Sequence, residues 1–232
     1  MKAKYFITLL ISAMFIYSCE LNHDESFIVT FDFFDDADGW TGDFADYPVG
    51  GEEFYELNFT WSHLPAPLET TKGALMITGN NHSDDLFMFV KRKVDGLRPN
   101  TSYSITFDVE FASNAPTNAV GVGGAPGEGV TMKVGAVRTQ PAKVAGDDDN
   151  YTMNLDKGNQ AGSGTDMYAI GHVGVSDTTT VFTLIHRNNN SHPFVVNSDL
   201  NGEIWVVIGT DSGFEATTTL YYSKIKLWIK RN

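Results

Sequence analysis

Residues 102–111 contain the pattern that most limits the folds open to this chain. Tyr103, Ile105, Phe107, Val109 and Phe111 alternate with a polar residue at every position between them. A period of two places apolar side chains on one face of a strand and polar side chains on the other. The pattern therefore predicts a strand in a sheet with one buried and one solvated face.

Nine further segments have strand character, and clusters of Gly, Asn, Asp and Pro separate them. No segment keeps apolar residues at helical spacing over three turns. We therefore predict an all-β fold, a single antiparallel β-sandwich of the jelly-roll type over residues 27–232, with about ten strands and little helix. The expected strands are 27–34, 53–61, 74–78, 86–94, 102–111, 130–138, 168–175, 181–187, 203–209 and 218–229.

The charge balance and the cysteine count exclude several classes of function. Sixteen Lys and Arg residues stand against 29 Asp and Glu residues, a formal net charge of −13. Nucleic acid is excluded as a partner, because binding phosphates requires a basic surface. One cysteine allows neither a disulfide framework nor a Cys-rich zinc site.

The N-terminus has the features of an export signal. Two lysines within residues 1–4 precede an apolar run over residues 5–17, which is shorter than the roughly 20 residues that a membrane-spanning helix needs. Residues 16–19 read Ile-Tyr-Ser-Cys and resemble a bacterial lipobox. The resemblance implies a lipoprotein signal peptide over residues 1–18, acylation of Cys19, and an anchor in the outer membrane, with the domain on its periplasmic or cell-surface face. The polar residues up to Ser26 predict a short tether, so that the lipid anchor is the only membrane contact.

Two segments of the domain also carry a resemblance. Residues 96–109 read Gly-Leu-Arg-Pro-Asn-Thr-Ser-Tyr-Ser-Ile-Thr-Phe-Asp-Val, which is similar to a strand entry of jelly-roll carbohydrate-binding modules and galactose-binding-like domains. Residues 219–227 resemble the last strand of those domains. The resemblance implies a sandwich fold and a glycan or glycoconjugate ligand. Many such domains hold a structural calcium through an aspartate in that strand, where this chain has Ser223.

Alternation in the last expected strand predicts one set of ligand-binding rings. Ile225, Leu227 and Ile229 share a face with Tyr221, whereas the lysines share the other face with Tyr222 and Trp228. Since lysines indicate solvent, Tyr222 and Trp228 are expected to lie exposed, where aromatic rings can pack against sugars. The alternative is that another element covers them.

Other candidate ligand-binding residues lie in expected loops. Trp40, Tyr47 and Trp61 form a second candidate aromatic platform, and Arg187 and Asn189 belong to a polar stretch, 186–192, that can supply hydrogen bonds. The alternative for this stretch is a solvated hairpin.

Calcium is the one cofactor that the residues suggest. Asp35, Asp36 and Asp38 precede a Gly in one loop and offer the oxygen ligands that Ca²⁺ prefers. Residues 147–150 are a weaker candidate of the same kind. EF-hand spacing is absent from both, and a solvated acidic turn is the alternative reading.

Long loops and one short motif stay open to interpretation. Residues 112–129 and 146–166 are longer than most loops of a compact domain, so they are either functional or disordered. Asp211, Ser212 and Gly213 resemble the catalytic loop of aspartic proteases, but one copy cannot supply the paired carboxylates. We interpret residues 209–213 as a strand-terminating turn.

These observations favour a lipid-anchored binding protein that recognises carbohydrate without catalysis. No residue pattern identifies an acid/base pair, so the sequence favours a non-enzyme. A sandwich-fold glycoside hydrolase or polysaccharide lyase is the alternative if two carboxylates meet in one cleft. A structural or adhesion lipoprotein is the third reading, and a flat apolar patch would identify it.

Overall fold

The computed structural model describes residues 25–176 and 179–232. The predicted signal peptide, Cys19 and most of the predicted tether lie outside these residues. Within them the secondary structure consists of strands and turns, and no helix is long and apolar enough to cross a bilayer. The strands are β1 (Ser26–Phe31), β2 (Thr41–Ala45), β3 (Tyr47–Pro48), β4 (Asn58–His63), β5 (Gly73–Asn80), β6 (Leu86–Val94), β7 (Ser102–Ser113), β8 (Val130–Val137), β9 (Lys143–Ala145), β10 (Asn150–Met153), β11 (Tyr168–His172), β12 (Thr183–Asn188), β13 (Phe194–Asn197), β14 (Ile204–Ser212) and β15 (Thr217–Arg231).

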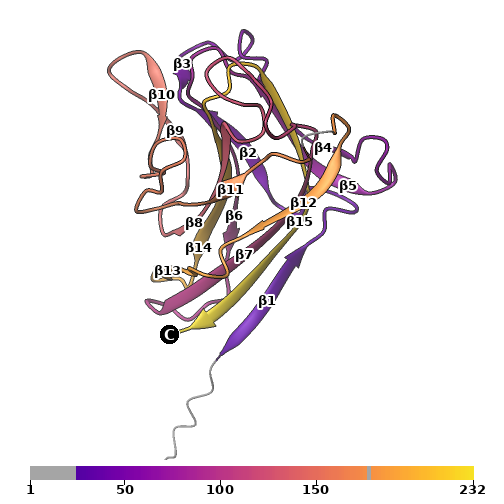
Figure 1. Ribbon diagram of the computed structural model, residues 1–232. Coiled ribbons are helices and arrows are strands. Elements are labelled where there is room, and N and C mark those ends of the chain that lie inside the picture. The colour runs from indigo at the N-terminus through magenta and orange to yellow at the C-terminus, as the bar shows by residue number, and fades with distance from the viewer. Residues whose placement is uncertain (1–24, 177–178) are drawn as a thin grey trace, which may run out of the picture.

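Two antiparallel sheets form a jelly-roll-like sandwich, which confirms the expected fold class (Figure 1). The seven-stranded sheet has the order β12-β7-β15-β5-β4, with β1 also paired to β15 and β13 also paired to β7. The five-stranded sheet has the order β11-β8-β14-β6-β2. Strands β3, β10 and β9 form a small third sheet.

Both large sheets bury one face in a shared apolar core. The alternation in β7 is confirmed: Tyr103 and the apolar residues after it are buried, and the polar residues between them are half-buried. Burial of these side chains is the main term stabilising the sandwich, at about 25 cal/mol per Å² of apolar surface.

Strand β15 departs from strict alternation at one position. Its register with β7 shifts between Tyr222 and Lys224, so Ser223 forms a β-bulge. A bulge adds one residue and reverses which side chains face the core beyond it. Tyr222 is therefore buried in the core rather than exposed, and the expectation that it shares the solvent face with Trp228 is wrong.

Several expected strand boundaries are also wrong. Residues 53–57 form a turn in which Glu56 has a positive φ of 52°, so β4 begins only at Asn58. The expected turn over residues 209–213 is instead mostly strand, because β14 continues to Ser212. Strands β2, β3, β9, β10 and β13 were not expected, since each has five residues or fewer and weak alternation.

A covering segment, residues 138–167, packs over the outer face of the five-stranded sheet. Met153, Leu155 and Met167 contact a second apolar cluster there, which contains Phe87 and Phe89. The approach is close at Gly135, where an added Cβ would lie 2.1 Å from the backbone oxygen of Asp166. This segment includes the whole of the long loop 146–166, which is therefore an ordered part of the domain.

Candidate functional site

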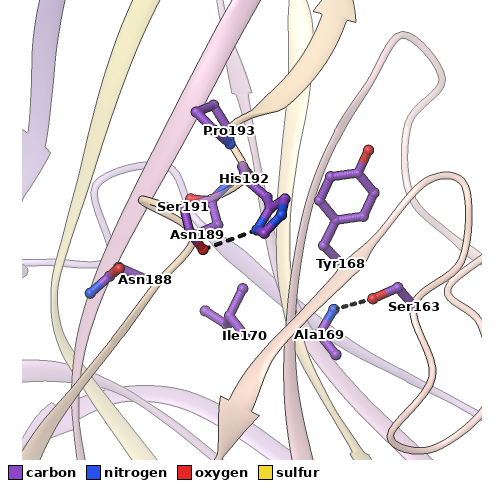
Figure 2. A pocket seen from close by; sticks show the side chains of 9 residues that line it. All are labelled: Ser163, Tyr168, Ala169, Ile170, Asn188, Asn189, Ser191, His192 and Pro193. Atoms are coloured by element: carbon purple, nitrogen blue, oxygen red, sulfur yellow. Dashed lines mark hydrogen bonds between the residues drawn. The ribbon is translucent and has the colours of Figure 1, made fainter.

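A groove opens at one edge of the sandwich, between the two large sheets. Strands β12 and β13 pair with successive parts of β7, so residues 189–193 turn at the edge of the seven-stranded sheet. Strand β11 is the matching edge strand of the five-stranded sheet. We call the space between them the edge groove, which has a volume of about 770 Å³. Its lining residues are Ser163, Tyr168, Ala169, Ile170, Asn188, Asn189, Ser191, His192 and Pro193 (Figure 2).

The apolar wall of the edge groove comes from β11. Tyr168 and Ile170 both line this wall, and the register of β11 with β8 shifts between Ala169 and Gly171. The Tyr168 ring packs against the buried ring of Phe194, with centroids 4.6 Å apart and planes tilted by 47°. Because both residues also contact the main core, this wall is fixed in position before any ligand binds.

The polar wall comes from the turn between β12 and β13. His192 and Ser191 are hydrogen-bonded, with Nδ1 and Oγ 3.0 Å apart, and they lie across the groove from Tyr168 (Figure 2). The exposed Asn188 extends the polar lining at the end of β12. On the other side, the Ser163 hydroxyl accepts a hydrogen bond from the Ala169 backbone nitrogen at 3.0 Å.

Asn189 fixes the shape of this turn. Its Oδ1 accepts a hydrogen bond from the Phe107 nitrogen at 2.6 Å, and its Nδ2 donates to the carbonyls of Ile105 and His192 at 3.2 Å each. The side chain is 4% exposed. Its amide is therefore occupied with positioning the turn, and a ligand meets the neighbouring side chains rather than the Asn189 amide itself.

The edge groove carries no formal charge on its lining side chains, apart from the titratable imidazole of His192. The nine residues include no Asp, Glu, Lys or Arg, although the whole chain has a net charge of −13. An aromatic ring beside hydroxyls, amides and an imidazole suits an uncharged ligand with many hydroxyl groups. The volume falls in the usual range for ligand sites, roughly 300–1,000 Å³. No lining carboxylate is present to act as an acid or base.

Three aromatic residues of the predicted platforms are buried. Trp40 is 2% exposed and packs edge-on against Phe31 at 5.4 Å, so it belongs to the core. Tyr47 is 1% exposed, and its hydroxyl donates to Glu52 at 3.0 Å. Tyr222 is buried behind the β15 bulge. Buried rings cannot stack on a ligand at the surface, so the predicted loop platform does not form as expected.

The remaining predicted residues lie at separate places. Trp61 is half-buried, and its Nε1 donates to the Phe33 carbonyl at 2.8 Å. Trp228 is 37% exposed on the outer face of the seven-stranded sheet, as expected, next to Ile28 in the register of β1. The Arg187 guanidinium donates to the backbone carbonyls of His172 and Gly174. Of the seven predicted ligand-binding residues, only Asn189 lines the edge groove.

The predicted calcium loop contains its own hydrogen bonds and an ion pair. Asp36 Oδ1 accepts a hydrogen bond from the Asp38 nitrogen at 2.6 Å, and Asp38 Oδ1 lies 2.8 Å from Arg92 Nη1. Asp35, Asp36 and Asp38 all line one shallow hollow of the surface. Arg92 supplies positive charge where calcium was predicted, and calcium binding there stays a prediction.

Among the described residues, the carboxylates that do come together are those of Asp46, Asp85 and Asp211, with oxygens within 4.8 Å of one another. Lys157 from the covering segment lies among them, with Nζ 2.9 Å from Asp46 Oδ2 and 2.8 Å from Asp211 Oδ2. Lys133 Nζ donates to the same Asp211 oxygen at 2.8 Å, and both of these side chains are fully buried. We call these five residues the charged cluster. An ammonium group already occupies the position in which a metal ion would be held.

Electrostatics in the charged cluster follow from burial. Burial raises the pKa of Asp46 and raises that of Asp85 to about 6, in both cases against the opposing effect of Lys157. Burial also lowers the pKa of Lys133, although Asp211 opposes the shift. Lys157 shows the opposite balance: its burial is outweighed by Asp211 and Asp46, so its pKa is raised. The ion pairs therefore keep Lys157 charged inside the protein.

The charged cluster ties the covering segment to the sheet. Lys133 Nζ donates to the Lys157 carbonyl at 2.8 Å, and Lys91 Nζ donates to the Pro141 carbonyl at 2.6 Å. Asp156 next to Lys157 accepts hydrogen bonds from Thr165 and Gly158, which lower its pKa and close the loop that contains Ser163. Lys157 of the charged cluster and the adjacent Asp156 thus position the loop whose Ser163 lines the edge groove.

Sequence reasoning missed Tyr168 and Ile170 as site residues, although it identified the strand that carries them. Their spacing of two residues was no reliable signal for a shared face, because the register of β11 shifts between Ala169 and Gly171. What the spacing could not reveal is that β11 is an edge strand and that the turn after β12 lies opposite it, because both facts depend on strand order.

No known protein-family model matches the chain, and no curated protein matches it. Solved structures with similar folds include a carbohydrate-binding module that recognises mannan, with 12% identity and a TM-score of 0.41, covering 90% of this chain and 99% of that one. A family 11 carbohydrate-binding module from Clostridium thermocellum, in complex with a β-1,3-1,4-mixed-linked tetrasaccharide, has 10% identity and a TM-score of 0.40, covering 86% and 94%. The chain spans only 20% of the length of a bacteriophage CBA120 tailspike domain, which it matches with 8% identity and a TM-score of 0.39.

Proposed function

We propose that this protein binds a glycan in the edge groove and does not transform it. The observation that carries the proposal is the composition of the groove: the Tyr168 ring stands opposite uncharged hydrogen-bonding groups on the 188–193 turn. Aromatic faces pack against the C–H faces of sugars, and amides and hydroxyls select among hydroxyl positions. Catalysis is not part of the proposal, because most glycoside hydrolases use a pair of carboxyl groups and the nine residues that line the groove supply none.

Affinity gel electrophoresis tests the proposal with soluble β-glucan, mannan, xylan, galactan and glucuronoxylan. At least one should retard the protein, and Tyr168→Ala should weaken that retention about tenfold or more, because it removes the stacking surface. Trp228→Ala is the matched control, since its exposed ring lies on the outer face of the other sheet. Retention that depends on Trp228 and not on Tyr168 would move the site to that face. No retention by any glycan, or release of sugar from one, would contradict the proposal.

The cellular setting belongs to the same proposal. Acylation of Cys19 and export to the outer membrane would hold the domain by its N-terminal side, and β1 and the C-terminal end of β15 lie together at that end of the sandwich (Figure 1). Several acyl chains, each contributing about 0.8 kcal/mol per buried CH₂, would anchor the protein durably. Mass spectrometry of the protein from membranes should show a diacyl or triacyl Cys19 as the first residue, and an unmodified Cys19 would contradict this part.

A further inference from the structure

A second groove lies next to the first along the same edge of the sandwich. It has a volume of about 380 Å³ and is lined by β13, the end of β8 and the covering segment. Strand β11 covers β8 only as far as Val134, so the last residues of β8 are open to this groove. The lining residues are Ala136, Val137, Arg138, Thr139, Asn154, Leu155, Thr165, Asp166, Phe194, Val195, Val196 and Asn197.

The two grooves meet at one pair of rings. Tyr168 lines the edge groove, Phe194 lines the second groove, and their centroids are 4.6 Å apart. The covering segment lines both grooves, with Ser163 in the first and Thr165 and Asp166 in the second. From Pro193 to Asn197 the chain advances roughly 13 Å at about 3.3 Å per residue. A cleft of that length is longer than a single pyranose ring.

The far end of the cleft differs from the edge groove in charge. Arg138 is exposed there, and within the described residues its guanidinium has no hydrogen bond or ion pair. Asp166 lines the same groove, but its Oδ2 accepts a hydrogen bond from the Asp156 nitrogen at 2.9 Å. The carboxylate of Asp199 lies near Arg138. Its Oδ1 accepts hydrogen bonds from the Glu203 and Asn201 nitrogens, which lower the pKa of Asp199 together with the charge of Arg138. Arg138 is thus available to an anionic group of a ligand.

The overall charge limits how many anionic groups the ligand can carry. A chain with net charge −13 repels a polyanion, whereas a single guanidinium can bind one carboxylate or sulfate with charge-assisted hydrogen bonds. We propose that the cleft holds an extended oligosaccharide, neutral where it crosses Tyr168, with an isolated acidic group that binds Arg138. This inference rests on the proposed function and adds the class of glycan to it.

Matched pairs of glycans test the inference by isothermal titration calorimetry. Oligosaccharides from glucuronoxylan are compared with the same material after carboxyl reduction, and a sparsely sulfated galactan is compared with its desulfated form. One acidic member should bind about tenfold more tightly than its neutral counterpart, and Arg138→Ala should abolish this difference. Arg138→Lys should restore part of it, and Lys72→Ala, which removes an exposed lysine from the β4–β5 connection, should leave it unchanged.

The outcomes separate this inference from the proposed function. Tyr168→Ala should weaken the acidic and the neutral members alike, because both cross the ring. If every acidic glycan binds no better than its neutral form, or if Arg138→Ala does not reduce the preference, the inference is overturned. Sensitivity to Tyr168→Ala would then still uphold glycan binding in the edge groove. If no glycan binds, both proposals fail together.

Discussion

The edge groove and the charged cluster are two regions where this sandwich gathers polar side chains, and they are built in opposite ways. The groove is open and lined by uncharged residues. The cluster is buried at its centre, where the side chains of Lys133 and Asp211 are fully buried. A buried charge is tolerated only when it is paired, so the cluster is suited to holding the covering segment. The comparison indicates that the buried ion pairs of the charged cluster position a loop that lines the edge groove, whereas the lining side chains themselves are neutral.

Asp211→Ala tests the closed region most severely. It leaves the fully buried Lys133 without its carboxylate partner, and we expect the free energy of unfolding to fall by about 3–5 kcal/mol. Urea denaturation monitored by tryptophan fluorescence measures the loss. Lys72→Ala is the control for an exposed pair, 3.8 Å from Glu69, and should change stability by less than about 1 kcal/mol. A loss at Asp211 as small as that of the control would contradict the role given to the cluster.

Asn189→Ala tests the open region next. The substitution removes a buried amide that makes three hydrogen bonds, so we expect a loss of about 1–3 kcal/mol in stability. Glycan binding should weaken as well, because the 188–193 turn would lose its fixed shape. Asn190→Ala is the matched control, since Asn190 is exposed in the same turn. An Asn189→Ala variant with unchanged affinity and stability would show that the turn is shaped by other contacts.

Substitution of Asp85 is expected to have the smallest effect on the free energy of unfolding, and this effect depends on pH. Its pKa is raised from 3.8 to about 6, so the folded state holds the proton more tightly than the unfolded state. The contribution of Asp85 is therefore present below about pH 4 and is lost as the pH rises through about 6. Asp85→Asn should raise the free energy of unfolding at pH 7 by at most about 1 kcal/mol, because half of the side chain is exposed. It should also flatten the pH dependence between those values in a series of urea titrations, and a lower stability of the variant at pH 7 would contradict the sign.

Much of the fold was predictable because its strands alternate. The pattern from Tyr103 to Phe111 identified β7, and the expected strand from Leu86 to Val94 matched β6 in full. The position of Tyr222 was mispredicted, since one inserted residue at Ser223 reverses the alternation, and the adjacent Tyr221 and Tyr222 fit either face. Asp211 was misread for a related reason: a carboxylate after an apolar run resembles the end of a strand unless a partner such as Lys133 is known to lie beside it.

The candidate site was predictable only in part. The polar stretch around Asn189 was identified as a source of hydrogen bonds, and it does border the groove. The aromatic partner was expected among Trp40, Tyr47, Trp61, Tyr222 and Trp228, whereas Trp40 is in the core and Tyr168 provides the ring. Strand order decides which ring meets which turn, and no local pattern encodes that order.

Chemical-shift mapping tests most directly the claim that the neutral groove binds ligand while the charged cluster only supports it. The ¹⁵N-labelled protein is titrated with oligosaccharides from the glycan panel. Amide signals of residues 163–170 and 188–193 should shift, and those of Asp46, Asp85 and Asp211 should stay in place. Shifts centred on Trp228, or on the charged cluster, would contradict the account, as would a spectrum that no member of the panel changes.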